Sequence, residues 1–305
     1  MTLAAVGGGA WLLRIVGVID EQSALEKWAW SFALGVGVIG WSVFFFALAG
    51  KINTPWLIGI CLVLISGIVF LRPSFHNLKN VGNMIQFRLT WPMVLIIGII
   101  VALSFDLLEG LAPPTDGDSL AYHFALPKLF LNFGELVFVP RANDGAVPLL
   151  QQMTFLMALK LGGEQGLTLW AMLSSWGACL VLFAILRRHV QPTFALATAL
   201  VFLTTPAVVY SGGSGQVEIR NAMFVVVAAV AVGDALRTGQ WRYAVLAGLA
   251  AGFYVGSKYP GLLFAFTCAV GLMFQRRWLS HGLGFTLAVI IAGGQWYANE
   301  PPPVE

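Results

Sequence analysis

Apolar blocks of helical length, separated by short polar turns, follow one another along most of the chain. Windows of about 20 residues predict ten such segments, near residues 2–19, 28–50, 55–71, 89–110, 165–186, 190–210, 221–236, 243–257, 261–274 and 279–297. Backbone groups in lipid must be satisfied inside the protein, which an α-helix achieves within one segment. We therefore predict an all-α fold, a polytopic transmembrane helical bundle of about ten spans.

One stretch interrupts this series. Residues 111–146 are polar and rich in Pro, Gly, Asn and Asp. The apolar run 147–161 that follows is broken by Gln151 and Gln152. Because this run is shorter than a full span, we expect it not to cross the membrane. The pattern predicts one or two interfacial helices within a large outer loop, residues 111–164.

Basic residues decide the orientation, because the positive-inside rule places Lys and Arg in cytoplasmic loops. Arg72, Lys79 and Arg88 precede the 89–110 segment, which should therefore run outward and leave 111–146 outside. The three later pairs of arginines fall inside only if the next apolar run does not cross. This topology puts 11 of the 17 basic residues inside and 10 of the 14 acidic residues outside. The inner basic residues are then Arg14, Lys27, Arg72, Lys79, Arg88, Arg187, Arg188, Arg237, Arg242, Arg276 and Arg277.

Composition agrees with a membrane protein. Hydrophobic residues make up 58% of the 305 residues, charged residues only 10%, and the mean hydropathy is +0.83, whereas a soluble domain carries about 25% charged residues. The net charge of +3 includes no basic run of the kind that follows nucleic acid. Cys61, Cys179 and Cys268 lie in apolar blocks without CxxC spacing, so we expect neither a disulfide framework nor a zinc site. Arg14 within the first segment favours a helix over a signal peptide.

The predicted topology gathers polar residues from separate segments on the outer face. They are Asp116, Asp118, Tyr122, His123, Lys128, Arg141, Glu218, Arg220, Lys258 and Tyr259. Each has a purely structural alternative. The Asp-Gly-Asp at 116–118 favours a tight turn, the cations could reach lipid phosphates, and Glu218 suits the start of a helix. Together, however, they indicate chemistry, because moving a sugar from a lipid phosphate needs a carboxylate base and a cation or metal near the phosphate.

The stretch PPTDGDSLAYHFALPKLFLNFGELVFVP (113–140) resembles the first outer loop of the GT-C superfamily of membrane glycosyltransferases. That superfamily includes protein mannosyltransferases and the enzymes that add aminoarabinose to lipid A. The residues that carry the resemblance are Asp118, Leu120, Tyr122, His123, Pro127, Lys128, Gly134, Phe138 and Pro140. Residues 187–189, 215–224 and 247–263 also resemble family segments, so that the likeness covers roughly 89–297.

The resemblance implies roles for several residues. Asp118 would be the catalytic base or a metal-linked carboxylate, with Asp116 supporting it. Lys258 would face the donor phosphate. The substrate-binding candidates are Tyr122, His123, Lys128, Arg141, Glu218, Arg220, Lys258 and Tyr259. A divalent metal, Mg or Mn, is left open at the two aspartates, because two carboxylates fall short of the six or more oxygens that such ions take.

Two positions depart from the family pattern. Glu218 stands where many members carry Asp, and Gln152 stands near a position often filled by Glu. Family members usually continue beyond the point where this chain ends, at ANEPPPVE, so we expect a truncated sequence. We divide the chain into N-terminal helices (1–88), a GT-C-like catalytic core (89–297) and a short tail (298–305).

The function expected from these features is transfer of a sugar from a polyprenyl-phosphate donor to a lipid, glycan or protein acceptor. The enzyme would act at the extracytoplasmic face of the plasma (inner) membrane, in the cell envelope. Two alternatives stay open: a transporter or flippase for lipid-linked or small polar substrates, and a non-catalytic membrane scaffold. The donor sugar, the acceptor and the oligomeric state leave no trace in the sequence.

Overall fold

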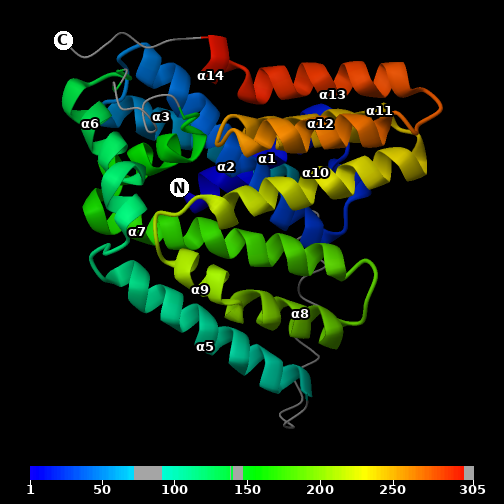
Figure 1. Ribbon diagram of the computed structural model, residues 1–305, viewed down its shortest axis with the longest axis horizontal. Helices are drawn as coiled ribbons and strands as arrows, with labels where there is room; N and C mark the ends of the chain where they lie inside the picture. The colour runs from blue at the N-terminus through cyan, green and yellow to red at the C-terminus, as the bar shows by residue number, and fades with distance from the viewer. Residues whose placement is uncertain (72–90, 138, 140–146, 299–305) are drawn as a thin grey trace.

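The computed structural model describes residues 1–71, 91–137, 139 and 147–298. Within those ranges the regular structure is helical and no strand occurs, which confirms the all-α prediction. The helices run largely side by side across the view in Figure 1, with α5 at one edge and α13 at the opposite edge.

The first half of the chain supplies α1 (Thr2–Val16), α2 (Ala24–Leu48), α3 (Thr54–Ile65), a 3₁₀ turn (Ser66–Leu71), α5 (Trp91–Leu111), a π-helical turn (Ser119–His123) and α6 (Ala125–Phe133). The second half supplies α7 (Leu150–Leu186), α8 (Pro192–Thr204), α9 (Pro206–Gly212), α10 (Glu218–Thr238), α11 (Trp241–Val255), α12 (Pro260–Leu272), α13 (Trp278–Gly293) and α14 (Gln295–Ala298). Every apolar segment predicted from the sequence corresponds to one of these helices, to a pair of them or, for 165–186, to the second part of α7.

Within the described ranges, five helices are long and apolar enough to cross a membrane, and a sixth span results if α8 and α9 are taken together. α1, α12 and α13 are apolar but shorter. Large apolar side chains cover much of the surface, and the apolar window of α5 is only 11% buried. In water such a surface would be strongly unfavourable, so it is suited to face lipid, and the chain is a helical membrane protein.

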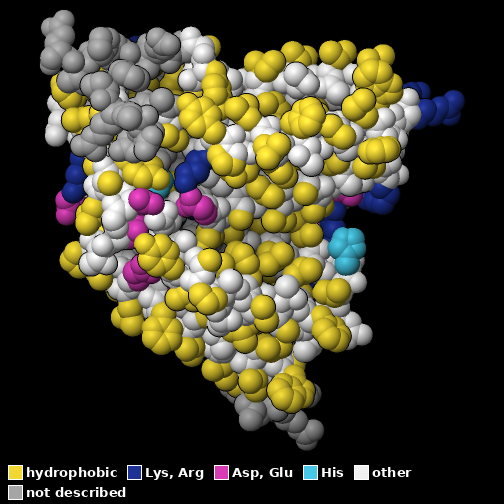
Figure 2. Space-filling view, in the orientation of Figure 1, with side chains coloured by type: hydrophobic (Ala, Val, Ile, Leu, Met, Phe, Trp, Pro, Cys, Tyr) yellow, Lys and Arg dark blue, Asp and Glu magenta, His cyan; other side chains and the backbone are white. Residues whose placement is uncertain are grey.

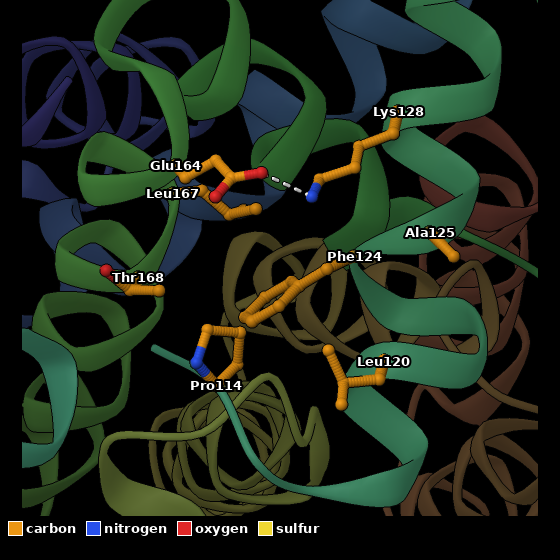
Figure 3. Close-up of a pocket in the computed structure, with 8 residues that line it drawn as sticks. All are labelled: Pro114, Leu120, Phe124, Ala125, Lys128, Glu164, Leu167 and Thr168. Atoms are coloured by element: carbon orange, nitrogen blue, oxygen red, sulfur yellow. Dashed lines mark hydrogen bonds and ion pairs between the residues drawn. The ribbon is translucent and has the colours of Figure 1, made fainter. Parts of the chain in front are cut away.

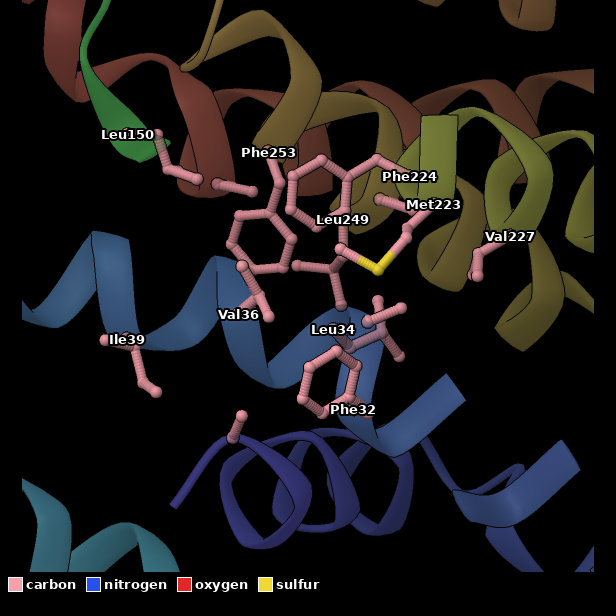
Figure 4. Close-up of a cluster of buried hydrophobic side chains, with 14 of the residues drawn as sticks. Phe32, Leu34, Val36, Ile39, Leu150, Met223, Phe224, Val227, Leu249 and Phe253 are labelled. Carbon is pink, nitrogen blue, oxygen red and sulfur yellow. The ribbon is translucent and has the colours of Figure 1, made fainter. Parts of the chain in front are cut away.

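α2 lies at the centre of the bundle. Its Phe32 and Leu34 pack with Met223 and Phe224 of α10 and with Phe253 of α11 (Figure 4). Glycines allow α1 and α2 to approach closely. A Cβ on Gly9 would overlap the carbonyl oxygen of Ser31, and one on Gly35 would overlap that of Ala5. Small residues at such positions are typical of helix pairs in membranes.

The charged loops lie at two opposite ends of the bundle. At one end Arg188, after α7, pairs with Glu26 of α2 and, at 2.8 Å, with Asp234 of α10. Figure 2 shows charged side chains near the left and right edges of the view, with a largely hydrophobic surface between them. The loops predicted to share the inner side thus do lie together. Which end faces the cytoplasm stays a prediction, and Arg72, Lys79 and Arg88 lie outside the described residues.

The apolar run 147–161 forms the first part of α7. Gly163, with φ 65° and ψ −163°, breaks α7 between this part and the predicted 165–186 segment. Residues 150–157 are all buried, and the backbone N–H of Leu150 donates to the carbonyl of Gly256 at 3.0 Å. We expected an interfacial helix here. The structure instead packs this part of α7 inside the protein. α6 is the helix of the outer loop that lies at the surface, and it exposes both polar and apolar side chains.

Candidate functional site

Three segments build a polar region at the outer end of the predicted topology. They are the loop after α5 with its π-helical turn, the connection between α9 and α10 (213–217), and the turn between α11 and α12 (256–259). The first contacts the second through hydrogen bonds from Gln216. Glu218, the first residue of α10 directly after the second segment, forms an ion pair with Lys258 of the third.

Asp116 is the more constrained of the two predicted carboxylates. Its Oδ2 accepts the backbone N–H of Ser119 at 2.8 Å and also the Ser119 hydroxyl, while Tyr210 donates to Oδ1 at 2.7 Å. Gln216 Nε2 lies 3.2 Å from Oδ1. Partial burial by itself raises the pKa of Asp116, but the hydrogen bonds from Ser119, Tyr210 and Gln216 outweigh it and hold the pKa at about 2. The carboxylate is therefore ionised at neutral pH.

Asp118 is the more accessible carboxylate. Its side chain belongs to an exposed residue, and Gln216 Nε2 donates to its Oδ2 at 3.3 Å. The same amide nitrogen thus lies between both aspartates. An incoming hydroxyl can approach the free oxygen sites of Asp118, whereas those of Asp116 already accept several bonds.

His123 lies inside the protein. It is 0% exposed, and its Nδ1 is 2.7 Å from Nε2 of Gln152. Burial, followed by the positive charge of Lys258, lowers the pKa of His123 to about 3, so the imidazole is neutral. The neighbouring Tyr122 ring lies 3.9 Å from it between centroids. His123 is therefore the buried, neutral end of the π-helical turn, and its neighbour Tyr122 is half-buried.

Lys258 and Glu218 form an ion pair in which Lys258 is 24% and Glu218 52% exposed. Glu218 is the first residue of α10, where a carboxylate is favoured by the helix dipole. Tyr259 follows at the surface, with its ring 6.2 Å from that of Tyr297. The predicted cation for a donor phosphate is thus partly exposed in the turn between α11 and α12, and its partner Glu218 follows two residues after Gln216.

Arg220 does not join this surface. Its side chain is 0% exposed, its Nε donates to Ser174 Oγ at 2.8 Å and its Nη2 to the carbonyl of Ser214 at 2.8 Å. Further bonds run to the carbonyls of Gln216 and Ala171. We expected a substrate-binding cation at this position. The structure instead places the guanidinium beneath the loop, where protein oxygens occupy its donors.

Lys128 lies at the edge of a separate pocket of about 100 Å³. Its Nζ pairs with Glu164 at 2.5 Å across the mouth (Figure 3). The walls below this pair are mainly apolar and come from the outer loop and α7; the lining residues are Pro114, Leu120, Phe124, Ala125, Lys128, Glu164, Leu167 and Thr168. Arg141 lies outside the described residues, as do Phe138 and Pro140 of the family pattern.

Several residues of this region escaped the sequence analysis. Glu109 accepts the backbone N–H of Gly213 at 3.1 Å, and Asp106 accepts Trp176 Nε1 at 3.0 Å. Tyr210 and Gln216, which contact the aspartates, were missed as well. Asp106 and Glu109 are ionisable residues near the end of an apolar span, and that pattern alone could have marked them. Nothing in the sequence distinguishes Tyr210 or Gln216 from ordinary loop residues.

The carboxylates of this region do not by themselves form a metal site. Among the residues that the structure describes, no three His, Cys, Asp or Glu side chains gather closely enough to hold a metal ion. Asp116 and Asp118 are a pair bridged by an amide N–H donor, and a cation there would have to displace that donor or share the carboxylates with it. Metal dependence stays a prediction.

Comparisons with known proteins gave one result. Residues 147–293 match the family model described as "Dolichyl-phosphate-mannose-protein mannosyltransferase". No curated protein and no solved structure matched the chain. The matched range includes α7 to α13 and therefore Glu218, Lys258 and the Gln216 loop, and it begins after the two aspartates. It supports a membrane glycosyltransferase of the GT-C type.

Proposed function

On the strength of that family match, we propose that this chain transfers a sugar from a polyprenyl-phosphate donor to a hydroxyl acceptor on the extracytoplasmic face of the membrane. The observation that carries the proposal is that one short loop connects an accessible carboxylate to a partly exposed cation. Gln216 contacts Asp118, and two residues later Glu218 holds Lys258. A base and a phosphate-binding cation are the two groups that the reaction needs.

The reaction balances with these groups alone. Asp118 accepts the proton of the acceptor hydroxyl, and the acceptor oxygen forms a bond to the anomeric carbon of the sugar. The bond from that carbon to the phosphate oxygen breaks, and polyprenyl phosphate leaves with the bonding electrons. A single displacement of this kind inverts the anomeric configuration. Lys258 would stabilise the charge on the leaving phosphate, once its ammonium exchanges Glu218 for the phosphate oxygens.

Asp116 has a different role in this proposal. Because its oxygens accept Ser119, Tyr210 and Gln216, it fixes the start of the π-helical turn and the position of the loop across it. Asp118, two residues away, is thereby held in place. The apolar pocket beside Lys128 lies on the same outer loop, and its walls suit an apolar portion of a lipid-linked substrate.

The proposal is tested by reconstituting the chain in lipid vesicles and adding a panel of radiolabelled polyprenyl-phosphate sugars with lipid, glycan and peptide acceptors. Parallel samples contain Mg²⁺, Mn²⁺ or a chelator, which tests the metal. We expect label to move to an acceptor and polyprenyl phosphate to be released in equal amount. Folded protein that releases no polyprenyl phosphate from any donor contradicts the proposal.

One observation favours a second function. α8 and α9 meet at a bend of 71°, and Asp106, an ionisable residue in a span, is buried beside them. Broken helices and intramembrane charges are typical of transporters. A flippase would move the intact donor across the bilayer without breaking the sugar–phosphate bond. Donor that changes leaflet with no release of polyprenyl phosphate would support it over sugar transfer.

A further inference from the structure

We propose that Arg220 is a positioning residue, which seats the segment from Gly212 to Gln216 against the two aspartates. The inference rests on the proposed function, because it assigns a role toward the candidate base. Arg220 touches neither aspartate itself. It acts through the loop that begins where α9 ends and leads into α10.

The guanidinium ties this loop to the body of α7. Two of its acceptors are the carbonyls of Ser214 and Gln216 in the loop. The other two, Ser174 Oγ and the carbonyl of Ala171, belong to α7. The arginine also lies over the Phe155 ring, with Cζ 5.3 Å from the centroid. A buried cation is tolerated only when its donors are paired, so the loop carbonyls are held in this arrangement as long as the arginine is present.

The outer side of the same loop contacts the carboxylate region at successive residues. Gly213 N–H donates to Glu109 at 3.1 Å, Gly215 N–H donates to Ser119 Oγ at 2.8 Å, and Gln216 donates to both aspartates. Ser119 is itself a donor to Asp116. The loop therefore separates the buried guanidinium of Arg220 from the carboxylates, and it contacts both through its own residues.

Glycine is required for this close approach. A Cβ on Gly213 would lie 2.5 Å from Glu109 Oε2, and one on Gly215 would lie 2.7 Å from Ser119 Oγ and 2.8 Å from the Phe124 ring. Any side chain there would lift the loop off its partners. Gly215→Ala is thus a second way to unseat the loop, and it leaves Arg220 intact. Gly233→Ala is the matched control on α10, because nothing lies within 4 Å of the added Cβ.

The first arm of the test is kinetic. In the proposed transfer reaction, Arg220→Met and Gly215→Ala should each lower kcat at least tenfold while the donor KM changes less than threefold, because Asp118 is misplaced but Lys258 is not. Arg220→Lys keeps the charge but not the fork of donors and should retain an intermediate rate. Gly233→Ala should match the wild type. Equal kcat in wild type and Arg220→Met overturns the inference.

The second arm needs no activity. Cys61, Cys179 and Cys268 are replaced by Ala, and Ser214→Cys is introduced as a reporter, because Ser214 is 5% exposed and its carbonyl accepts a hydrogen bond from Arg220. We expect the thiol at position 214 to react slowly with a water-soluble maleimide, and at least fivefold faster when Arg220→Met is added. A labelling rate unchanged by Arg220→Met overturns the inference.

The two arms separate the two proposals. If the wild type transfers no sugar, the proposed function fails, and the labelling rate at position 214 alone still decides whether Arg220 seats the loop. Thermal unfolding and size-exclusion elution in detergent are measured for every variant. A variant that elutes as folded protein but exposes the thiol at position 214 supports positioning, since general unfolding would remove the monodisperse peak as well.

Discussion

Asp116 and Asp118 are two residues apart, yet the structure gives them different surroundings. The sequence marked both as candidates because their types and their place after a span suit a base. It could not say which is open, because the deciding contacts come from Tyr210 and Gln216, about a hundred positions away. The same limit explains Arg220. A basic residue near a predicted loop was read as a surface cation, whereas long-range packing buries it.

The hydrogen bonds of Asp116 should contribute to the free energy of unfolding in a pH-dependent way. Its pKa in the folded protein is about 2, below the ordinary 3.8. A depressed pKa contributes stability that is present above the unfolded value and lost as pH falls toward the folded one. Because the group is partly open to water, we expect Asp116→Asn to cost about 1 kcal/mol at pH 7. Thermal unfolding of both proteins between pH 7 and about 3 should show the gap closing as pH falls; a gap independent of pH contradicts this account.

Lys258 should matter more than other cations of the same end. Replacing it by Gln removes the charge that faces the leaving phosphate, so kcat/KM for the donor should fall about 10- to 100-fold, or about 1.4–2.7 kcal/mol. The matched control is Lys51→Gln, because Lys51 lies over the Trp56 ring at 5.1 Å on another loop of that end. Equal kcat/KM for the two variants would contradict a role for Lys258 in binding the donor phosphate.

Among the helices, α7 and the α8–α9 pair show what periodicity can and cannot predict. The gap between the apolar run ending at 161 and the segment starting at 165 marked the break at Gly163. The bend between α8 and α9 was missed, since residues 190–210 are mostly apolar and carry no charge. Its local cause is Pro206, which fixes its own φ and favours an extended Thr205, observed at ψ 128°. Burial of residues 150–157 was also missed, because it depends on partners from α2 and the 256–259 turn.

The break in α7 gives a prediction with an adjacent control. Gly163 has φ 65° and ψ −163°, a conformation that side chains disfavour strongly. Gly163→Ala should therefore destabilise the protein by about 1–3 kcal/mol. Gly162→Ala meets no atom within 4 Å and has no positive φ, so it should be neutral or slightly stabilising. The two variants are compared by thermal unfolding in detergent. Equal changes in stability would contradict the prediction that a side chain at position 163 strains the backbone.

At the scale of the whole bundle, ion pairs at the inner end of the predicted topology connect α2, α7 and α10. Arg188 pairs with Glu26 and Asp234, whose side chains are 4% and 7% exposed, and its guanidinium carbon lies 5.2 Å from the Trp30 ring. The positive-inside rule predicted that these loops share a face, because each carries or directly adjoins basic residues. It could not predict the pairing, which depends on how the helices are turned about their axes.

Removing this cation should be costly. Arg188→Met leaves the buried Glu26 carboxylate without its cation and leaves Asp234 with Arg237 alone, at 3.0 Å, so we expect a loss of about 3 kcal/mol in unfolding free energy. Arg187→Met is the matched control, since Arg187 donates to the carbonyl of Val190 and forms no ion pair among the described residues. Detergent unfolding of the two variants should separate them clearly, and a similar small loss in both would show that the pairs contribute little.

The central claim is that Asp118 takes the proton of the acceptor in sugar transfer. The most direct measurement is single-turnover release of polyprenyl phosphate in vesicles by wild type, Asp118→Asn and the control Asp20→Asn, whose side chain is 74% exposed at the other end. We predict that Asp118→Asn lowers the rate about 100-fold or more, with donor binding retained and Asp20→Asn unchanged. A wild-type rate from folded Asp118→Asn protein would contradict the assignment.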